Sequence, residues 1–251
     1  MDEQFAEVSS PIHRTDPAVR ILAAVLYSFT VALADSLLAL AAALLFSALL
    51  AAAARLPIKP LLKRLGAAGG FLLLLWLVLP WSYPGDPLMR VGPLVVSREG
   101  VWMCLRITCK TSAILIGFTA LVASMHLATL GHTLSRLGMP NKLVHLLLLA
   151  YRYIFVIRIE YQRLLRAAKL RNFRPATTMH TYRTYAYLLG MLFVRASERS
   201  ARVHQAMKCR GFDGRFHSLD RFGATAWNPA LAAAVIAASA GLILINQFTV
   251  A

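Results

Sequence analysis

The chain has 251 residues, of which 58% are apolar and 15% are charged, and its mean hydropathy is +0.60. Soluble domains are about 45–50% apolar and about 25% charged, so both departures indicate a membrane protein and exclude intrinsic disorder. Three cysteines are too few for a disulfide scaffold. The net charge of +16 comes without a recognisable nucleic-acid module. We therefore expect the basic residues to mark cytoplasmic loops and to meet anionic lipid, with no nucleic-acid partner.

Five segments are apolar enough to be interpreted as membrane spans, since a spanning helix needs about 20 mostly apolar residues. We predict them near 19–34, 36–54, 66–83, 101–123 and 222–251. The first two share one apolar stretch and turn at Asp35-Ser36. Pro80 and the Pro84-Gly85-Asp86-Pro87 run end the third and open a loop over 84–98. The expected fold class is all-α, a polytopic integral membrane helical bundle.

The fourth predicted span carries two cations, Arg106 and Lys110, which are four residues apart and share a helix face. Charged side chains in a membrane snorkel to an interface or face a bundle interior. Two alternatives stay open, snorkelling near the helix start or a polar contact to a partner subunit. We also expect small residues to let neighbouring helices approach closely. These residues are Ala41, Ala42, Ala43, Gly69 and Gly70.

Positive charges predict the orientation of the chain. Arg55, Lys59, Lys63 and Arg64 lie between the second and third predicted spans, and the positive-inside rule puts that loop in the cytoplasm. The N-terminus is then cytoplasmic, whereas the turn at Asp35, the 84–98 loop and the C-terminal end face outside. Residues 1–16 contain four acids and no apolar core, so we expect no cleavable signal.

Residues 150–221 hold 15 of the 27 Lys and Arg residues but only four acids. This stretch has no uncharged run long enough to span, so we predict a basic cytoplasmic helical module broken by Pro175 and by Gly211–Gly214. The run 143–157 is too short to assign as a span, and it could lie in the membrane interface or pack inside the bundle. The predicted domains are a transmembrane region of about four spans over 1–142, the basic module with a start that could be membrane-embedded over 143–221, and a transmembrane helix over 222–251.

Within the module the pattern Ala-x-Lys-x-Arg-x-Phe occurs twice, 39 residues apart. Asn172 and Gly211 in the two copies fit helix C-terminal caps, and cations suit a last helical turn. The copies could be two ordinary helix ends. They could instead be docking helices, in which Arg donates a five-donor fork to carboxylates and Phe is an apolar anchor. The candidate partner-binding residues are Ala168, Lys169, Arg171, Asn172, Phe173, Ala206, Lys208, Arg210, Gly211 and Phe212.

The sequence has no phosphate-binding loop and none of the zinc-protease or serine-hydrolase motifs. Its seven histidines are scattered rather than clustered. We therefore expect no catalytic residue, no metal site and no cofactor in this chain, and no ATP hydrolysis by the chain alone.

These features resemble the transmembrane T component of energy-coupling factor (ECF) transporters, and within that family CbiQ of cobalt uptake systems. The resemblance covers nearly the whole chain. It begins with His13-Arg-Thr-Asp16-Pro17-Ala-Val-Arg20, continues with Leu134-Ser-Arg-Leu-Gly138-Met-Pro140-Asn-Lys-Leu143, and ends with the two Arg-containing motifs and a final apolar span. The family motifs are of the Ala-Arg-Gly type. The second copy matches them well, and the first departs by having Asn172 where Gly is usual.

The resemblance implies a non-catalytic scaffold in the bacterial inner membrane. Such a subunit joins two CbiO-like ATPase subunits, which bind ATP and Mg, to a CbiM-like substrate-binding membrane subunit that holds the metal. A small CbiN-like subunit often accompanies cobalt systems. Arg171 and Arg210 would then be ion-pair anchors, and Phe173 and Phe212 apolar anchors.

Other functions stay open at this point. The chain could be a nickel or vitamin T component of the same transporter class. It could also be a stand-alone secondary carrier or channel, a membrane enzyme acting on lipid head groups, or a structural anchor whose basic helices bind anionic lipid. A carrier would need a polar pathway, and Arg106 and Lys110 are its only candidates in the sequence.

Overall fold

The computed structural model describes residues 15–84, 87–91, 94–212 and 227–250. These residues are helical almost throughout, which confirms the predicted all-α class, and the 84–98 loop contains a two-stranded antiparallel hairpin. The chain divides into two compact units, residues 1–130 with 221–251, and residues 131–220. The predicted start of the last span at 222 and the Gly214 break lie outside the described residues.

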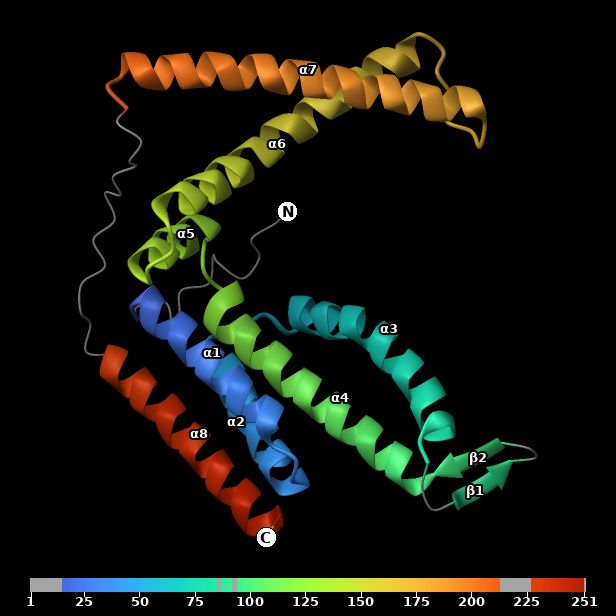
Figure 1. Cartoon of the computed structure of the whole chain (residues 1–251), viewed down its shortest axis with the longest axis vertical. Helices are drawn as coiled ribbons and strands as arrows, with labels where there is room; N and C mark the ends of the chain where they lie inside the picture. Colours follow the sequence, from blue (N-terminus) through green and yellow to red (C-terminus); the bar gives the residue numbers. More distant parts are fainter. Residues whose placement is uncertain (1–14, 85–86, 92–93, 213–226, 251) are drawn as a thin grey trace. The chain divides into compact units, whose positions relative to one another are not determined.

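The first unit is a bundle of apolar helices with the hairpin at one end (Figure 1). Its elements are α1 (Pro17–Leu33), α2 (Leu37–Ala53), α3 (Ile58–Ser82), β1 (Pro87–Val91), β2 (Leu94–Ser97), α4 (Arg98–Phe118), the π-helical turn η2 (Thr119–Ala123) and α8 (Trp227–Val250). Within this unit α1 and α2 both pack against α4 and α8, whereas α3 packs mainly on α4. A helix α5 (Leu127–Arg136) follows η2.

The predicted α1–α2 hairpin is confirmed, and side-chain caps define its helix starts. Asp16 Oδ1 accepts a hydrogen bond from the Ala18 N–H at 2.9 Å, and a proline at the first helical position is already in helical conformation. Ser36 Oγ accepts from the Ala39 N–H at 3.3 Å and begins α2. The turn at Asp35 therefore follows from local sequence.

Two distant side chains complete this turn. Asn246 Oδ1, from α8, accepts hydrogen bonds from the N–H groups of Asp35 at 2.9 Å and Ser36 at 3.0 Å. Lys110 Nζ, from α4, donates to the Ala32 carbonyl at 2.9 Å and pairs with Asp35 Oδ1 at 3.0 Å. The Lys110 charge is therefore paired with a helix end and a carboxylate of the same chain, and both interpretations given above for this residue stay predictions.

Arg20 makes a second link that the sequence analysis did not assign. It lies buried near the start of α1 and donates a hydrogen bond to Ser124, the residue after η2. Its Nε, like that of Arg106 in α4, is buried without a hydrogen-bond partner among the described residues. Arg20 thus fixes the start of α1 against the end of the continuous α4–η2 helix.

Tyr27 lies at the centre of the apolar core of this unit. It is fully buried, its hydroxyl donates to the Ala43 carbonyl at 2.7 Å, and its ring lies 5.6 Å from the Phe46 ring. A side chain added at Gly117 of α4 would place its Cβ 2.7 Å from the Tyr27 ring. Gly117 therefore permits the close approach of α4 to α1.

The predicted small-residue contacts are only partly correct. Ala43 is buried in the core, but Ala41 is exposed, and a Cβ at Gly69 or Gly70 would meet no described atom within 4 Å. The expectation for these two glycines is wrong because α3 packs mainly on α4, and they do not face it closely. The close approach between α4 and α3 is instead at Gly100 of α4, where an added Cβ would lie 2.9 Å from the Pro80 backbone of α3.

Three helices are long and apolar enough to cross a membrane, Ile58–Ser82, Arg98–Ala123 and Pro229–Phe248, and α1 and α2 are shorter apolar helices. The basic loop expected before the third span is largely helical, because α3 already begins at Ile58. Only 6% of the apolar window of α3 is buried, against 33% for Arg98–Ala123. One flank of the unit thus presents an apolar helix to its surroundings.

Replacing Gly117 by Ala should destabilise the first unit, because the new methyl group would overlap the Tyr27 ring. Overpacking of this kind costs about 1–3 kcal/mol. Thermal unfolding of the purified chain in detergent measures the effect. Gly70→Ala is the matched control, which should unfold at the wild-type temperature or slightly above it. Equal unfolding temperatures for both variants would contradict the close contact.

Candidate partner-binding site

The two copies of the repeated pattern lie in the second unit, at the ends of its two long helices. These are α6 (Asn141–Leu170) and α7 (Met179–Cys209). They cross where Arg195 of α7 pairs with Glu160 of α6, and the Phe173 and Tyr185 rings pack edge to face at 5.6 Å. From the crossing, the start of α6 and the end of α7 diverge (Figure 1). The break predicted at Pro175 is confirmed, since it lies between the two helices.

The first copy ends α6 with a main-chain cap. Asn172 has φ 63°, in the left-handed region. Its N–H donates to the Lys169 carbonyl at 3.0 Å, and the Phe173 N–H donates to the Ala168 carbonyl at 3.1 Å. This pair of hydrogen bonds is the Schellman motif, which satisfies the last carbonyls of a helix.

The second copy ends α7 in the same way. Gly211 has φ 75°, its N–H donates to the Lys208 carbonyl at 3.0 Å, and the Phe212 N–H donates to the Met207 carbonyl at 3.1 Å. The predicted caps at Asn172 and Gly211 are therefore confirmed. Asn reproduces the geometry of Gly because it tolerates the left-handed conformation better than most residues.

The cap geometry is not peculiar to these two helix ends. The same hydrogen-bond pair ends α2 at Arg55, with φ 49°, and α5 at Gly138, with φ 94°. A Schellman motif is thus an ordinary way for this chain to end a helix. Any partner-binding role must come from the side chains that the two copies present.

The cations of both copies are exposed. Lys169 and Arg171 in the first copy, and Lys208 and Arg210 in the second, make no side-chain hydrogen bond or ion pair with any residue that the structure describes. The main chain caps each helix without them. Their donors therefore remain available to an external acceptor, such as a carboxylate or a carbonyl at the end of a helix.

The remaining candidate residues of the two copies differ between the helix ends. Asn172, Ala206 and Gly211 are exposed, and Ala168 is half-buried. Phe173 is only 8% exposed because it packs on Tyr185 within the unit, whereas Phe212 is half-buried. The structure thus uses Phe173 to hold α6 against α7, and its role as an anchor for a partner stays a prediction.

Sequence reasoning missed one apolar candidate. Leu170, between Lys169 and Arg171, is 90% exposed at the last position of α6. The equivalent residue of the second copy is Cys209, which is also exposed. The sequence held no signal for Leu170, because tertiary packing decides whether a leucine at a helix end is buried or exposed.

Known proteins are similar to this chain over most of its length. The sequence model of the CbiQ family, described as cobalt transport protein, matches residues 8–219. The chain is 26% identical to the energy-coupling factor transporter transmembrane protein EcfT of Heliobacterium modesticaldum, over 84% of this chain and 83% of that protein. It is 27% identical to EcfT of Acidaminococcus fermentans, over 86% of both chains. It is 28% identical to the cobalt transport protein CbiQ of Salmonella typhimurium, over 59% of this chain and 68% of that protein.

The apolar helices and these matches define a helical membrane protein of a transport system. More narrowly, the chain belongs to the CbiQ family, the transmembrane T components of energy-coupling factor transporters. In the part of the chain that the structure describes, no group of three or more His, Cys, Asp or Glu residues could hold a metal ion.

The left-handed conformation of Asn172 predicts how substitutions there behave. Asn172→Gly should keep the cap, whereas Asn172→Val should open it, because a β-branched residue in this region costs about 1–2 kcal/mol. Amide hydrogen exchange at Asn172 and Phe173 measures the cap, and exchange in the Val variant should be roughly 5–30 times faster than wild type. Wild-type protection in the Val variant would show that residue 172 does not need this conformation.

Proposed function

We propose that this chain couples two ATPase subunits to a substrate-binding membrane subunit of an ATP-driven metal importer. The observation that carries the proposal is the pair of matched helix ends, each with an exposed Lys-x-Arg and the same main-chain cap. Two like ends suit two like grooves on an ATPase dimer. In this proposal the ATPases are CbiO-like and bind ATP and Mg, and this chain is non-catalytic.

Arg171 and Arg210 are the proposed ion-pair anchors. Each follows the last helical residue and has no described partner, so its guanidinium can donate a bidentate fork to a carboxylate of the ATPase. Leu170 and Phe212 would add apolar contact around these pairs. ATP stabilises one conformation of the ATPase dimer. If the helix ends of this chain bind that conformation more tightly than the other, ATP binding also shifts the conformation of this chain.

Cobalt is the proposed cargo. The description of the family model and the name of the Salmonella typhimurium relative support this assignment. A CbiM-like subunit would hold the ion, and a CbiN-like subunit would accompany it. Nickel is the alternative cargo within the same architecture, and competition between the two ions in uptake by the assembled complex distinguishes them.

The proposed location is the bacterial inner membrane, which the chain crosses several times with residues 150–221 in the cytoplasm. Support comes from the three candidate spans, the two shorter apolar helices and the excess of positive charge in residues 150–221.

Cysteine labelling tests this topology. Thr177 is exposed in the α6–α7 connection and is not the capping residue of α7, which is Thr178. In a background with Cys104, Cys109 and Cys209 replaced, Thr177→Cys should react with a membrane-impermeant maleimide in inverted vesicles and not in intact cells. Labelling in intact cells would overturn the orientation.

Loss of the Arg anchors should weaken ATPase docking. Hydrogen bonds to charged groups contribute about 1.5–3 kcal/mol, so Arg171→Ala or Arg210→Ala should lower the affinity for the ATPases roughly ten- to a hundredfold. The double variant should lose them, and Arg210→Lys should already be defective because it keeps the charge without the fork. Co-purification of the ATPase subunits measures each case.

Arg183→Ala is the matched control for these variants. Arg183 is exposed on α7, lies outside both copies and makes no described side-chain contact, so its loss should leave co-purification unchanged. If the double variant retains the ATPases and supports ATP-dependent uptake at the wild-type rate, the two arginines do not bind the ATPase subunits and the proposal fails.

A further inference from the structure

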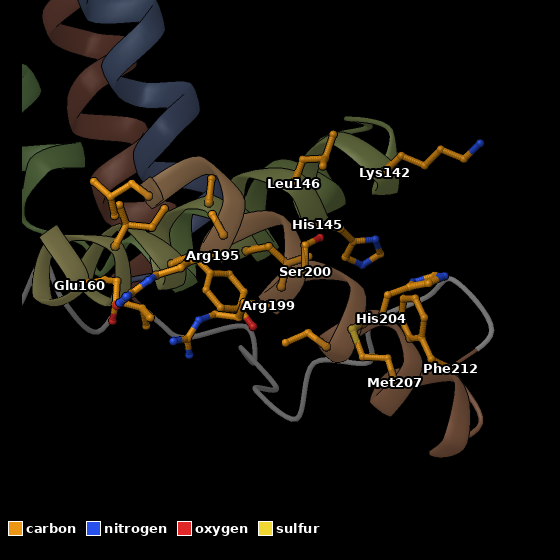
Figure 2. Close-up of a pocket in the computed structure, with 18 residues that line it drawn as sticks. Lys142, His145, Leu146, Glu160, Arg195, Arg199, Ser200, His204, Met207 and Phe212 are labelled. Carbon is orange, nitrogen blue, oxygen red and sulfur yellow. The ribbon is translucent and has the colours of Figure 1, made fainter. Parts of the chain in front are cut away.

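Arg106 of α4 differs from other cations that lie between helices of one unit. Arg195 of α7 pairs with Glu160 of α6 (Figure 2), and Lys110 of α4 pairs with Asp35. Arg106 makes no hydrogen bond or ion pair with any residue that the structure describes, and its Nε is buried. The first unit therefore leaves this positive charge of α4 without an acceptor among its described residues.

The position of Arg106 on α4 shows what can approach it. Trp102, Arg106 and Lys110 are spaced four residues apart and share one face of the helix. α3 packs on the opposite face, through Gly100 and Cys104. Trp102 is 41% exposed, so the row that contains Arg106 is only partly covered by the rest of the unit.

The α1–α2 turn ends well before α4 does. Lys110 Nζ donates to the Ala32 carbonyl at the end of α1, and Asn246 of α8 binds the same turn. α8 ends four residues after Asn246, whereas α4 extends from Lys110 back to Arg98, about 18 Å at 1.5 Å per residue. In Figure 1 that end of α4 lies beside the β1–β2 hairpin, away from the α1–α2 turn. Arg106 therefore lies about one helical turn beyond the level at which Lys110 meets α1.

The two helices that meet at this turn are short for a membrane. α1 and α2 have 17 residues each, about 25 Å, whereas the hydrocarbon core is about 30 Å thick. A bilayer accommodates a short span by local thinning, at modest cost. In its pair with Lys110, the Asp35 side chain is 63% exposed, and an exposed charge is least costly beside polar headgroups and water. We therefore expect lipid headgroups to lie over the α1–α2 turn.

We propose that Arg106 binds the phosphate of a phospholipid whose headgroup lies over the α1–α2 turn. A guanidinium donates a bidentate fork to phosphate oxygens, and the apolar stem of arginine lets its charged end reach the interface. Leu33 and Leu38, which are 74% and 63% exposed, flank the turn and would contact the acyl chains. Trp102 lies one helical turn further out, and tryptophan is enriched at the headgroup level.

The charges of this part of the unit favour an anionic ligand. Arg106, Lys110 and Asp35 together carry one excess positive charge. Glu99 is the sole acid of α4, lies about 10 Å along the helix from Arg106, and forms no ion pair with it. The proposal needs only the insertion of the first unit into a membrane, so it goes beyond the docking of ATPase subunits.

Native mass spectrometry of the full chain in detergent tests this site. The probes are phosphatidylglycerol and a diacylglycerol with the same acyl chains, because the diacylglycerol lacks the phosphate. Phosphatidylglycerol should bind the wild type roughly ten- to a hundredfold more tightly than the diacylglycerol. Arg106→Gln should remove most of that preference, and Arg106→Lys should retain part of it because lysine keeps the charge without the fork.

Arg98→Gln is the matched control for these variants. Arg98 is exposed at the first position of α4 and makes no side-chain contact with a described residue, so its loss should leave the preference at the wild-type value. Equal losses for Arg98→Gln and Arg106→Gln would overturn the proposal in favour of diffuse charge attraction. If the glutamine variant at position 106 unfolds at a lower temperature than the wild type, the lysine variant decides, and a wild-type preference in it would contradict bidentate binding.

A carboxylate on a membrane helix of the substrate-binding subunit is the alternative acceptor. In that case the isolated wild-type chain would bind both lipids equally, and Arg106→Gln would lower co-purification of that subunit in the assembled transporter. This combination would overturn the lipid assignment. A phosphatidylglycerol preference that depends on Arg106 supports the proposal whether or not Arg171 and Arg210 bind the ATPase subunits.

Discussion

The last carbonyls and first amides of a helix have no partner within the helix, so side chains, the neighbouring main chain or water must satisfy them. The α1–α2 turn meets this requirement with side chains far away in the sequence. Lys110 donates a hydrogen bond to the Ala32 carbonyl, and the side-chain oxygen of Asn246 accepts hydrogen bonds from two amides of the turn. Since these side chains belong to α4 and α8, their hydrogen bonds to the turn fix how far α4 and α8 extend along α1 and α2. Arg20 and Ser124 make the corresponding link at the other end of α1.

The same requirement has a different solution in the second unit. There the main chain caps itself, through residues in the left-handed region at Asn172 and Gly211. Lysine and arginine in a last turn can hydrogen-bond helix carbonyls themselves, but here that is unnecessary. The arginines at these two ends are consequently left without an internal role. A fold that ends its helices by backbone geometry releases charged side chains for binding other molecules.

Local sequence was sufficient wherever the interacting groups lie within a few residues of one another. The caps at Asp16 and Ser36 and the left-handed residues 172 and 211 belong to this kind, whereas the Asp35 turn also needs Lys110 and Asn246. Tertiary packing decided the rest. The sequence alone does not show whether Gly69 or Gly117 lies at a close helix contact. Gly117 does so because the Tyr27 ring packs against it, and Gly69 has no such neighbour. Likewise, nothing near Phe173 in the sequence shows that Tyr185 buries it while Leu170 stays exposed.

The connection between α6 and α7 makes the two matched helix ends mechanically unequal. Arg171 lies beside the Phe173–Tyr185 contact, where the two helices are joined. Arg210 lies at the far end of α7, and the stretch of helix from Tyr185 to Cys209 is about 36 Å long at 1.5 Å per residue. A rotation of α7 by about 10° about the Phe173–Tyr185 contact would move this end by about 6 Å and leave Arg171 almost still. Two chemically similar ends would thus follow the same rotation with very different amplitudes.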